Sequence, residues 1–355
     1  MNRFAGSPRR FIPLLAAISL LLFACASPPS SESPPGGEFL QHKAADGFQF
    51  RIMSWNVRVQ LMLSEPERRI DDIARFARAV QPDIIVLQEV MVTGIYEKLM
   101  SVMNDIAPPG PDQRWYFHWA SDNAVLSRYP LAQREQQLVA PYAFPTFPEY
   151  KYGQAVAVVD FPDELTAQDL FLVAMHNKSG VGEENIRLQQ MQSDSVVKAV
   201  RERIKQGQEQ SLPPGTPVIV AGDMNVIAGE PALHFKTLIS GDIADEETWG
   251  ADHPMDWDGS GLADAKPSHN NRGVHHYTWR QDSTPFPPGR FDRILYTDSV
   301  LQYVHGFVLN TTLMNDAILE RLGLNWADSL WQGNAGDFDH LPVIADFELK
   351  TQSEK

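Results

Sequence analysis

The stretch Val218-Ile219-Val220-Ala221-Gly222-Asp223-Met224-Asn225 combines an apolar run with polar residues that follow it. The run Val218 to Ala221 shows no alternation, which is typical of a strand that is buried on both faces of a sheet. Asp223 and Asn225 stand two positions apart, so their side chains point to one side if the extended backbone continues. A carboxylate and an amide at the end of a core strand suit phosphate and metal chemistry. Gly, Asp and Asn also favour a simple turn, so this stretch alone leaves both interpretations open.

The composition is that of an acidic chain with enough apolar residues for a large core. The 355 residues are 43% hydrophobic, which allows one large domain or two modest ones. The 45 acidic residues outnumber the 30 Lys and Arg and give a formal charge of -15. Such a surface does not attract polyanions, which argues against a processive DNA-binding protein. A phosphodiesterase remains compatible, because a bound metal can supply the missing positive charge.

The N-terminus resembles a bacterial lipoprotein signal. An apolar run from Phe11 to Phe23 follows two arginines and is shorter than the roughly 20 residues that a transmembrane helix needs. It leads into Leu22-Phe23-Ala24-Cys25, which resembles the lipobox, the motif in which a small residue precedes an acylated cysteine. Cys25 is the only cysteine, so the chain can form no intramolecular disulfide. We therefore expect lipidation at Cys25.

Three regions are expected on this basis. Residues 1–24 would be the signal peptide, residues 25–45 a flexible tether rich in Ser, Pro and Gly, and residues 46–350 one folded domain. Ala26, rather than Asp, follows the cysteine. This predicts an outer-membrane location in the bacterial cell envelope, facing the periplasm or the surface, with the membrane bound through the lipid anchor.

Residues 46–350 show the patterns of both strands and helices. Helices are expected at 66–80, 93–104, 183–204 and 231–239. Strands are expected at 48–57, 83–89, 115–119, 123–126, 154–161, 170–175, 218–221, 291–296, 302–309 and 342–347. The long helix at 183–204 would bury Ile186, Met191, Val196, Val197 and Val200. Residues 240–288 are polar and irregular, as expected of a functional loop. Strands joined by both helices and short turns favour an α/β domain with two packed mixed sheets and helices outside them.

Six of the expected strands end in acids, amides or imidazoles. These residues are Asn56, Glu89, His176, Asp223 with Asn225, Asp292, and Asp339 with His340. Each of them alone has an ordinary explanation, such as an asparagine that caps a turn or a histidine that is hydrogen-bonded in the core. Together they are hard to explain by packing, because every buried polar group needs a partner. We therefore predict that they meet in one site.

The motifs around these strand ends resemble the endonuclease/exonuclease/phosphatase superfamily of deoxyribonuclease-like, metal-dependent phosphohydrolases. The resemblance covers about residues 48–348 and consists of these motifs in the family's order: Trp55-Asn56, Gln88-Glu89, Leu126-Ser127-Arg128-Tyr129-Pro130, Gly222-Asp223-Met224-Asn225, Arg290-Phe291-Asp292-Arg293-Ile294 and Asp337-Phe338-Asp339-His340-Leu341-Pro342. It implies a four-layered α/β sandwich, in which two packed mixed β-sheets are flanked by helices. It also implies hydrolysis of a phosphoester by in-line attack of water, without a covalent intermediate.

The resemblance also implies the metal ligands. Glu89, with Asn56 and Asp339 nearby, would hold a divalent cation, Mg²⁺ or Mn²⁺. Ligand sets made only of oxygens suit such hard ions. The metal would act as a Lewis acid on the phosphoryl oxygen and as a template.

The remaining motif residues would carry the reaction. Asp223 and Asn225 would orient the attacking water and contact the phosphate oxygens. His340 would bind the phosphate, oriented by Asp292. His176 would be the second histidine of the site and would stabilise charge or assist the leaving group.

Two lysines are candidates for binding the substrate phosphate. Lys151 stands where some family members carry an arginine, and Lys178 follows the predicted site residue His176. For each of them an ordinary surface lysine is the alternative. Arg187 and Gln190 lie one turn apart on the expected helix at 183–204 and resemble a pattern that recurs in the family. We expect them to make structural contacts under the loop after His176.

The substrate remains open between several classes. The first hypothesis is an extracytoplasmic phosphodiesterase or nuclease that acts on nucleic acid. The second is a phosphatase or phospholipase C-type enzyme that acts on a lipid or small phosphoester, which a membrane tether would favour. The third is a non-catalytic binding lipoprotein. No obligate protein partner is evident from the sequence. The acidic residues at 240–288 allow either a solvated loop or, around Asp256-Trp257-Asp258-Gly259-Ser260-Gly261, a calcium site in which Pro254 replaces a required acid.

Overall fold

A computed structural model describes residues 37–42, 47–58, 66–90, 96–111, 113–143, 151–205, 207, 211–227, 232–330 and 337–350 of the chain. The predicted signal peptide, Cys25 and most of the expected tether lie outside these residues. The boundaries proposed for the three regions therefore stay predictions.

The first sheet contains six strands in the order β11-β12-β1-β2-β4-β3. Its strands are β1 (Gln49–Asn56), β2 (Ile84–Gln88), β3 (Tyr116–Ala120), β4 (Asn123–Ser127), β11 (Leu301–Val308) and β12 (Val343–Leu349). The central pair β1 and β2 is parallel and is joined through helix α2 (Pro66–Val80), whereas the other neighbours are antiparallel. Parallel neighbours need such a crossover. The sheet is therefore mixed.

The second sheet repeats this arrangement with the order β5-β6-β7-β8-β10-β9. Its strands are β5 (Leu131–Ala143), β6 (Lys151–Val159), β7 (Leu170–His176), β8 (Val218–Asp223), β9 (Ala263–Ala265) and β10 (Asp292–Tyr296). The parallel pair β7 and β8 is joined through the long helix α4 (Glu183–Ile204), and the remaining pairs are antiparallel. Each sheet thus has one parallel pair at its centre.

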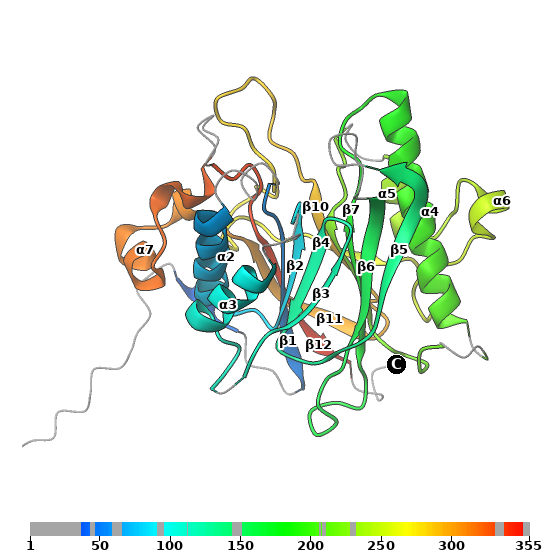
Figure 1. Cartoon of the computed structure of the whole chain (residues 1–355), viewed down its shortest axis with the longest axis horizontal. Coiled ribbons are helices and arrows are strands. Elements are labelled where there is room, and N and C mark those ends of the chain that lie inside the picture. The colour runs from blue at the N-terminus through cyan, green and yellow to red at the C-terminus, as the bar shows by residue number, and fades with distance from the viewer. Residues whose placement is uncertain are drawn as a thin grey trace, which may run out of the picture. The chain divides into compact units, whose positions relative to one another are not determined.

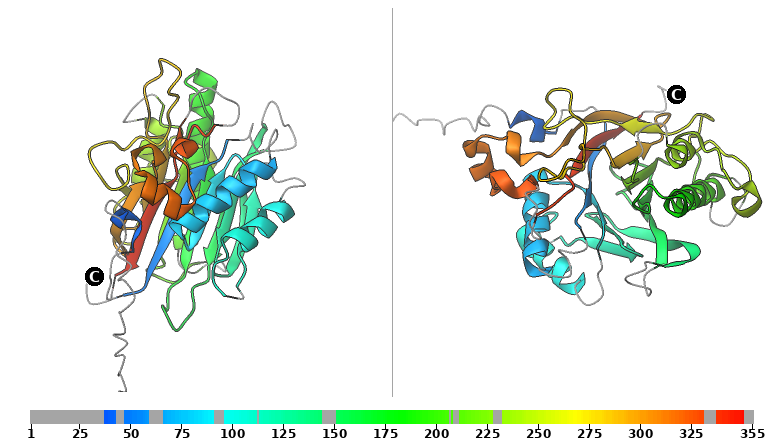
Figure 2. Two further views of the ribbon diagram at one scale, coloured as in Figure 1. Left: turned by 90° about the vertical axis from the view of Figure 1, so that its left-hand side faces the viewer. Right: turned by 90° about the horizontal axis from the view of Figure 1, so that it is seen from above.

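The two sheets pack face to face with helices on both outer sides (Figures 1 and 2). The inner layer between the sheets is apolar and includes Phe50, Ile52, Leu172, Ile219 and Phe347, all of them fully buried. This arrangement confirms the predicted four-layered α/β sandwich with two packed mixed sheets. Its apolar interior leaves the ends of the strands and the loops beside them for polar chemistry.

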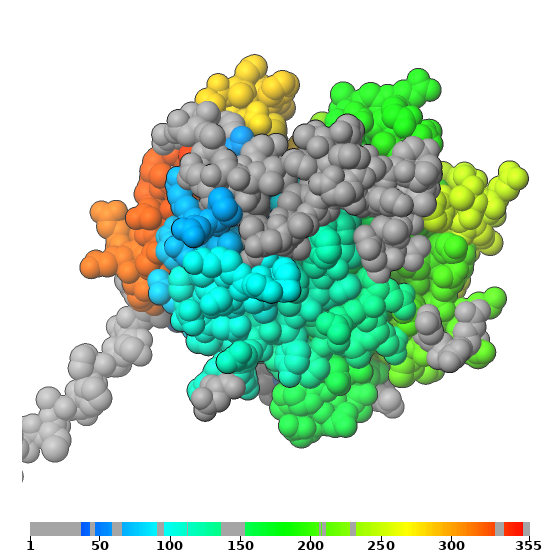
Figure 3. Space-filling model, in the orientation of Figure 1, coloured from blue at the N-terminus to red at the C-terminus, as the bar shows by residue number. Residues whose placement is uncertain are grey.

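The outer helices complete the sandwich. Helices α2 and α3 (Tyr96–Ile106) pack on the first sheet, together with α7 (Asp316–Leu322). Helices α4, α5 (Leu233–Ser240) and α6 (Glu246–Trp249) cover the second sheet. Short 3-10 helices lie at Glu38–Leu40, Thr311–Leu313 and Trp326–Ser329. Figure 3 shows α3 beside the segment from β3 to β5 on one face, where Tyr96 stacks on Phe117 at 6.2 Å between ring centroids.

Several sequence expectations about the elements need correction. Strand β5 and helix α7 were not expected, and residues 240–288 contain α6 and β9 rather than an entirely irregular loop. On α4, Ile186 is 46% exposed, while Leu188 is buried instead. Helix α4 is largely polar, so its apolar residues do not mark one face clearly. The sequence therefore did not show which side of the helix is buried.

Candidate active site

The polar residues predicted to share a site lie at one edge of the two sheets. Asn56 and Glu89 end or follow the parallel strands β1 and β2, and His176 and Asp223 end the parallel strands β7 and β8. Because neighbouring parallel strands end at the same edge, each sheet delivers two polar side chains there. Asp292 joins them, because it pairs with Asp223 across the antiparallel strands β10 and β8.

His340 lies between two carboxylates. Its Nδ1 is 2.8 Å from Oδ2 of Asp292, and its Nε2 is 3.7 Å from Oδ2 of Asp223. Burial alone would lower the pKa of His340, but the charges of Asp292 and Asp223 outweigh it and raise the pKa to about 10. The ring is therefore an imidazolium that can donate a proton or a hydrogen bond from Nε2. Trp55 fixes this segment, because its Nε1 donates to the backbone carbonyl of His340 at 3.0 Å.

His176 forms a second acid–imidazole pair. Its Nδ1 lies 2.6 Å from Oδ2 of Asp122, while its Nε2 is 3.7 Å from Oδ2 of Asp223 and 4.0 Å from Oε1 of Glu89. Burial lowers the pKa of His176, but the Asp122 carboxylate in particular raises it to about 9. Two cationic rings therefore flank Asp223.

Asp122 is a residue of the site that the sequence did not reveal. It lies in the two-residue turn between β3 and β4 and is almost completely buried. Ser121, Asp122 and Asn123 together look like ordinary turn chemistry, which hid the role of the carboxylate. The only signal was an acid next to the start of a strand, β4, whose residues are all buried.

Asn56 connects the two sheets within the site. Its Nδ2 donates to Oε1 of Glu89 at 3.0 Å and to Oδ2 of Asp223 at 3.0 Å, and its Oδ1 accepts from the backbone N–H of Arg58 at 3.0 Å. In this structure Asn56 thus orients two carboxylates. Its own oxygen is engaged with the backbone.

Asp223 and Asn225 are held rigidly at the end of β8. Oδ1 of Asp223 accepts the backbone N–H of Asn225 at 2.9 Å, and Nδ2 of Asn225 donates to the carbonyl of Asn177 at 2.8 Å. Asn225 has φ 47, which lies in the left-handed region that asparagine tolerates better than most residues. Burial raises the pKa of Asp223 to about 6, although the charges of His340 and His176 act in the opposite direction. The bond from the backbone N–H of Asn225 to Asp223 is that of an Asx turn, so the chain does turn here, and the same Asp223 carboxylate lies beside His340 and His176.

Glu89 and Asp339 have the character expected of ligands for a hard cation. Glu89 adopts φ 61, a costly conformation for a residue of this type and one that tends to occur at functional sites. Oδ1 of Asp339 is buried and, among the described residues, has no hydrogen-bond partner. Burial raises the pKa of Asp339, and the charge of Glu89 adds to this effect. A divalent cation near these two carboxylates would satisfy the buried oxygen and relieve their repulsion.

A second group of possible metal donors lies close by. Ligand atoms of Asp223, Asp292 and His340 lie within 4.8 Å of one another. Both ring nitrogens of His340 already face carboxylates. Both groups offer the carboxylate oxygens that suit a hard divalent cation.

The loop after His176 is supported by α4, but not through the residues expected. Gln192 donates to the carbonyl of His176 at 2.7 Å and accepts from the backbone N–H of Lys178 at 2.7 Å. Gln189 donates to the carbonyl of Lys178 at 2.7 Å. Arg187 and Gln190 make structural contacts as expected, but the contacts that are described lie elsewhere. Arg187 pairs with Glu184 of the same helix, and Gln190 donates to Asp194 and Thr237.

The two candidate lysines occupy different positions. Nζ of Lys178 donates to the carbonyl of Ser179 at 2.8 Å, in the loop that carries His176. Lys151 begins β6, and its side chain is not among those described. Substrate binding by either residue stays a prediction.

The carboxylate of Asp256 in the acidic loop accepts hydrogen bonds from other residues of the protein. Its carboxylate accepts from the backbone and hydroxyl of Ser299 and from the backbone of Trp257. Asp258 accepts from the backbone of Ser260 at 2.9 Å. Asp256 and Asp258 therefore stabilise the loop through local hydrogen bonds. Calcium binding there stays a prediction.

The residues that the structure describes include no helix that is both long and apolar enough to cross a membrane. The apolar run from Phe11 to Phe23 is not among them.

A family model identifies the chain. The model of the Endonuclease/Exonuclease/phosphatase family matches residues 53–312, which is more than half of the sequence. The chain belongs to the endonuclease/exonuclease/phosphatase family. The resemblance predicted from the motifs is thereby confirmed. Members of this family are phosphoesterases that depend on divalent metals, so the protein is a hydrolase that acts on phosphoester bonds.

Solved structures of the endonuclease/exonuclease/phosphatase fold superpose on most of the chain. Truncated TDP2 from Caenorhabditis elegans is 17% identical with a TM-score of 0.52, and the match covers 85% of this chain and 98% of that one. ANGEL2, described as a 2′,3′-cyclic phosphatase, is 13% identical with a TM-score of 0.55, and the match covers 87% of this chain and 98% of that one. The beta toxin of Staphylococcus aureus is 16% identical with a TM-score of 0.53, covering 83% and 99%.

These identities are low, so the superpositions support the fold and not a shared substrate. A search of curated proteins with the sequence gave no match.

Proposed function

We propose that the protein is an extracytoplasmic phosphodiesterase or nuclease that hydrolyses its substrate by direct attack of water and depends on Mg²⁺ or Mn²⁺. The observation that carries this proposal is the placement of two cationic imidazoles on either side of Asp223. His340 and His176 each have Nε2 at 3.7 Å from Oδ2 of that carboxylate. An anionic phosphate next to Asp223 would meet two positively charged donors there.

The side chains divide the reaction between them. Asp223, whose pKa lies near neutrality, can accept a proton from water, and Asn225 beside it is held in place by the carbonyl of Asn177. The imidazolium of His340 can bind a phosphoryl oxygen while Asp292 keeps the ring oriented. His176, held by Asp122, can donate a proton to the leaving oxygen. A divalent cation held by Glu89 and Asp339 would supply Lewis-acid activation of the phosphoryl group.

The test is hydrolysis of bis-p-nitrophenyl phosphate with Mg²⁺ by the full chain in detergent. We expect His340→Gln to lower kcat by at least about 100-fold, because a positioned proton donor contributes about 10²–10⁴. His275→Gln is the matched control, since His275 is exposed and lies outside the site. An equal rate in His340→Gln and wild type would refute the assignment of the site.

A phosphatase or phospholipase C-type activity on a lipid or small phosphoester is the second candidate. A membrane anchor would place the site near lipid headgroups, and the S. aureus beta toxin is among the proteins of similar fold. Parallel assays on plasmid DNA, sphingomyelin and inositol polyphosphate, each with Mg²⁺, distinguish the two candidates.

The lipobox-like sequence that ends in Cys25 supports a proposal for the location. We propose that acylation of Cys25 anchors the mature chain in the bacterial cell envelope, at the outer membrane. We expect Cys25→Ser to move the protein from the membrane fraction to the soluble fraction on centrifugation of lysed cells. Ser27→Ala, two residues further along, is the control. Unchanged partitioning of Cys25→Ser would contradict the anchor.

A further inference from the structure

A cleft of about 900 Å³ opens beside the site, and segments that carry site residues form its walls. Val226, which lines it, directly follows Asn225. Phe291, on another wall, directly precedes Asp292. A substrate whose phosphate is bound in the site would therefore extend into this cleft.

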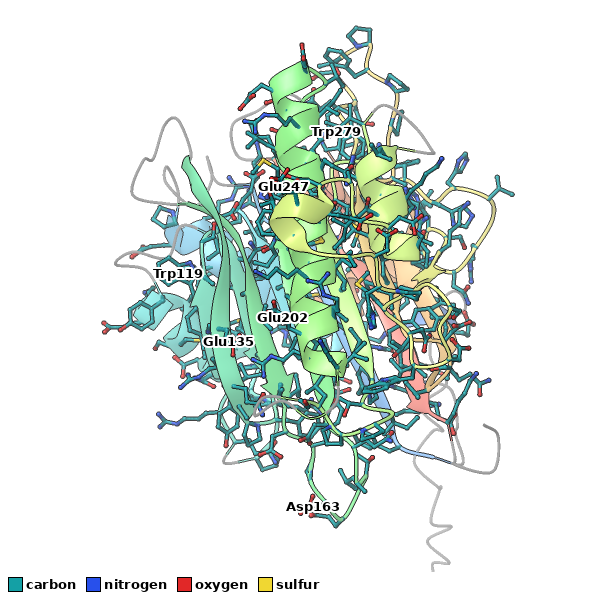
Figure 4. All side chains as sticks on the ribbon, turned by 90° about the vertical axis from the view of Figure 1, so that its right-hand side faces the viewer. Trp119, Glu135, Asp163, Glu202, Glu247 and Trp279 are labelled. Carbon is teal, nitrogen blue, oxygen red and sulfur yellow. The ribbon has the colours of Figure 1, made fainter. Side chains whose placement is uncertain are left out.

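Trp279 connects the cleft to the catalytic histidine. It forms a backbone bridge with His340, and its ring stacks on Phe291 with 5.1 Å between centroids and an angle of 23°. Phe291 in turn lies 6.3 Å from the ring of His340. Figure 4 shows Trp279 at the end of the molecule opposite the loop that carries Asp163. The indole is only partly buried, so part of its surface faces the cleft.

Several other lining residues are also aromatic or apolar. Phe286 is 62% exposed on the rim, and the lining further includes Ile227, Tyr277, Pro287 and Pro288. A contiguous group of exposed apolar side chains often marks a ligand-binding groove. Flat side chains such as these bind planar rings by stacking.

Basic side chains line part of the cleft in an otherwise acidic protein. Lys266, Arg290 and Arg293 line it, and none of its described lining residues is an Asp or Glu. Arg290 and Arg293 both donate to the carboxylate of Asp264, at 2.7 Å and 2.9 Å. The Lys266 ammonium group is a cation that can attract an anionic ligand.

We propose that this cleft binds the nucleobase of a nucleotide phosphoester, stacked on Trp279, while the scissile phosphate lies at His340. This rests on the proposed phosphodiesterase function and selects nucleic acid or nucleotides as the substrate class. Inositol phosphates would leave the aromatic walls without a partner. An acyl chain would gain nothing from the cations.

The test compares esters that share p-nitrophenol as leaving group and differ in the other substituent. These are the p-nitrophenyl esters of thymidine 5′-monophosphate, of methyl phosphate and of decyl phosphate. We expect kcat/KM for the thymidine ester to exceed that for the methyl ester by at least about tenfold, because stacking of one base is worth about 1–3 kcal/mol. Equal values for the two esters, or a preference for the decyl ester, would overturn the proposal.

Variants of Trp279 test whether the preference for the thymidine ester arises from stacking on this residue. Trp279→Ala should reduce the thymidine-to-methyl ratio to near one, whereas Trp279→Phe, which keeps a ring, should retain most of it. Trp326→Ala is the matched control, because Trp326 is 51% exposed and is not part of the cleft. A ratio that survives in Trp279→Ala with an unchanged Tm would place the base elsewhere and refute the assignment.

A binding measurement separates this inference from the proposed function. Calorimetry of the metal-free wild-type protein should show at least about tenfold tighter binding of thymidine 5′-monophosphate than of ribose 5-phosphate. If no ester is hydrolysed but this preference is seen, the proposed function fails and the cleft assignment stands. If all esters are hydrolysed and the two ligands bind equally, the function stands and the cleft assignment fails.

Discussion

At the scale of single residues, the histidines of this protein are held in different protonation states by their surroundings. His340 and His176 each face two or more carboxylates and are held as cations. His269 shows the opposite case. It is 1% exposed, its Nε2 lies 2.8 Å from the carbonyl of Tyr277, and its Nδ1 lies 3.0 Å from Nδ2 of Asn310. The ring donates to a carbonyl and accepts from an amide, so it must be neutral.

This neutral ring predicts a loss of stability in mild acid. Burial lowers the pKa of His269 from 6.5 to about 4, so below pH 6.5 the unfolded chain binds a proton that the folded chain does not. The contribution of the neutral ring is complete above pH 6.5 and is lost as the pH falls towards 4. Between pH 7 and pH 5 we expect this group to lower the free energy of unfolding by about 2 kcal/mol.

Urea unfolding at the two pH values measures this effect. In His269→Gln the difference in the free energy of unfolding between pH 7 and pH 5 should be about 2 kcal/mol smaller than in wild type. This holds whatever the stability of the variant at pH 7. His253→Gln, at a partly exposed histidine whose ring lies against the carbonyl of Pro254, should keep the wild-type difference. An unchanged pH dependence in His269→Gln would show that the ring titrates normally.

At the scale of elements, the pairing of β7 and β8 sets the position of the site. Gly222 pairs with Met175, and the next pair is Asp223 with His176. A Cβ at Gly222, which has φ 147, would lie 1.8 Å from the carbonyl oxygen of Met175. The two strands can approach closely enough to bring Asp223 to His176 only because no side chain stands at this position.

Gly222→Ala should therefore disrupt the fold and not only the activity. We expect a loss of at least about 3 kcal/mol in the free energy of unfolding by urea, or failure to fold. Gly259→Ala is the matched control. Gly259 also has positive φ, at +80, but a Cβ there meets nothing within 4 Å. It should cost about 1–2 kcal/mol. Equal losses in the two variants would indicate backbone strain as the cause, rather than the close strand contact.

The elements that sequence could predict are those with strong local patterns. Helix α2 was expected at its observed bounds, because Pro66 starts it and Pro82 follows it closely, with a clear apolar stripe between them. The strands that end in Asn56, Glu89 and Asp223 were predictable from apolar runs that stop at polar residues. The family motifs then indicated that these ends converge.

The parts that could not be predicted depend on contacts between distant segments. Strand β5 has a polar sequence and becomes a strand by pairing with β6 at the sheet edge. Asp122 joins the site only because the turn it occupies lies beside the end of β7, 54 residues away in sequence from its partner His176. No local pattern records such a contact.

At the scale of the whole molecule, the metal predicted at Glu89 and Asp339 would link function to stability. The buried Oδ1 of Asp339, which has no hydrogen-bond partner in the described part of the chain, is costly without a cation. We expect Asp339→Asn to leave the metal-free protein as stable as wild type or more so, since a buried charge is removed. The variant should also bind Mg²⁺ much more weakly.

Thermal unfolding with and without Mg²⁺ tests both expectations, the stability of the metal-free variant and its weaker binding of Mg²⁺. Wild type should gain about 2.7 kcal/mol at a metal concentration 100 times its Kd, and Asp339→Asn should gain little at the same concentration. Asp316→Asn, at an exposed acid of helix α7, should behave as wild type. A chelator should abolish hydrolysis. A full Mg²⁺ shift in Asp339→Asn would remove this residue from the metal site.

The hydrogen bonds of Asn56 affect how well the enzyme tolerates mutations between the two sheets. A single amide group holds Glu89 of one sheet and Asp223 of the other at 3.0 Å each. One residue of slippage between strands is about 3.3 Å, and a fraction of that distance would break one of these bonds. The geometry of the active site is therefore sensitive to small shifts of one sheet relative to the other. Mutations in the apolar layer between the sheets, however remote, should reduce turnover well before they unfold the chain.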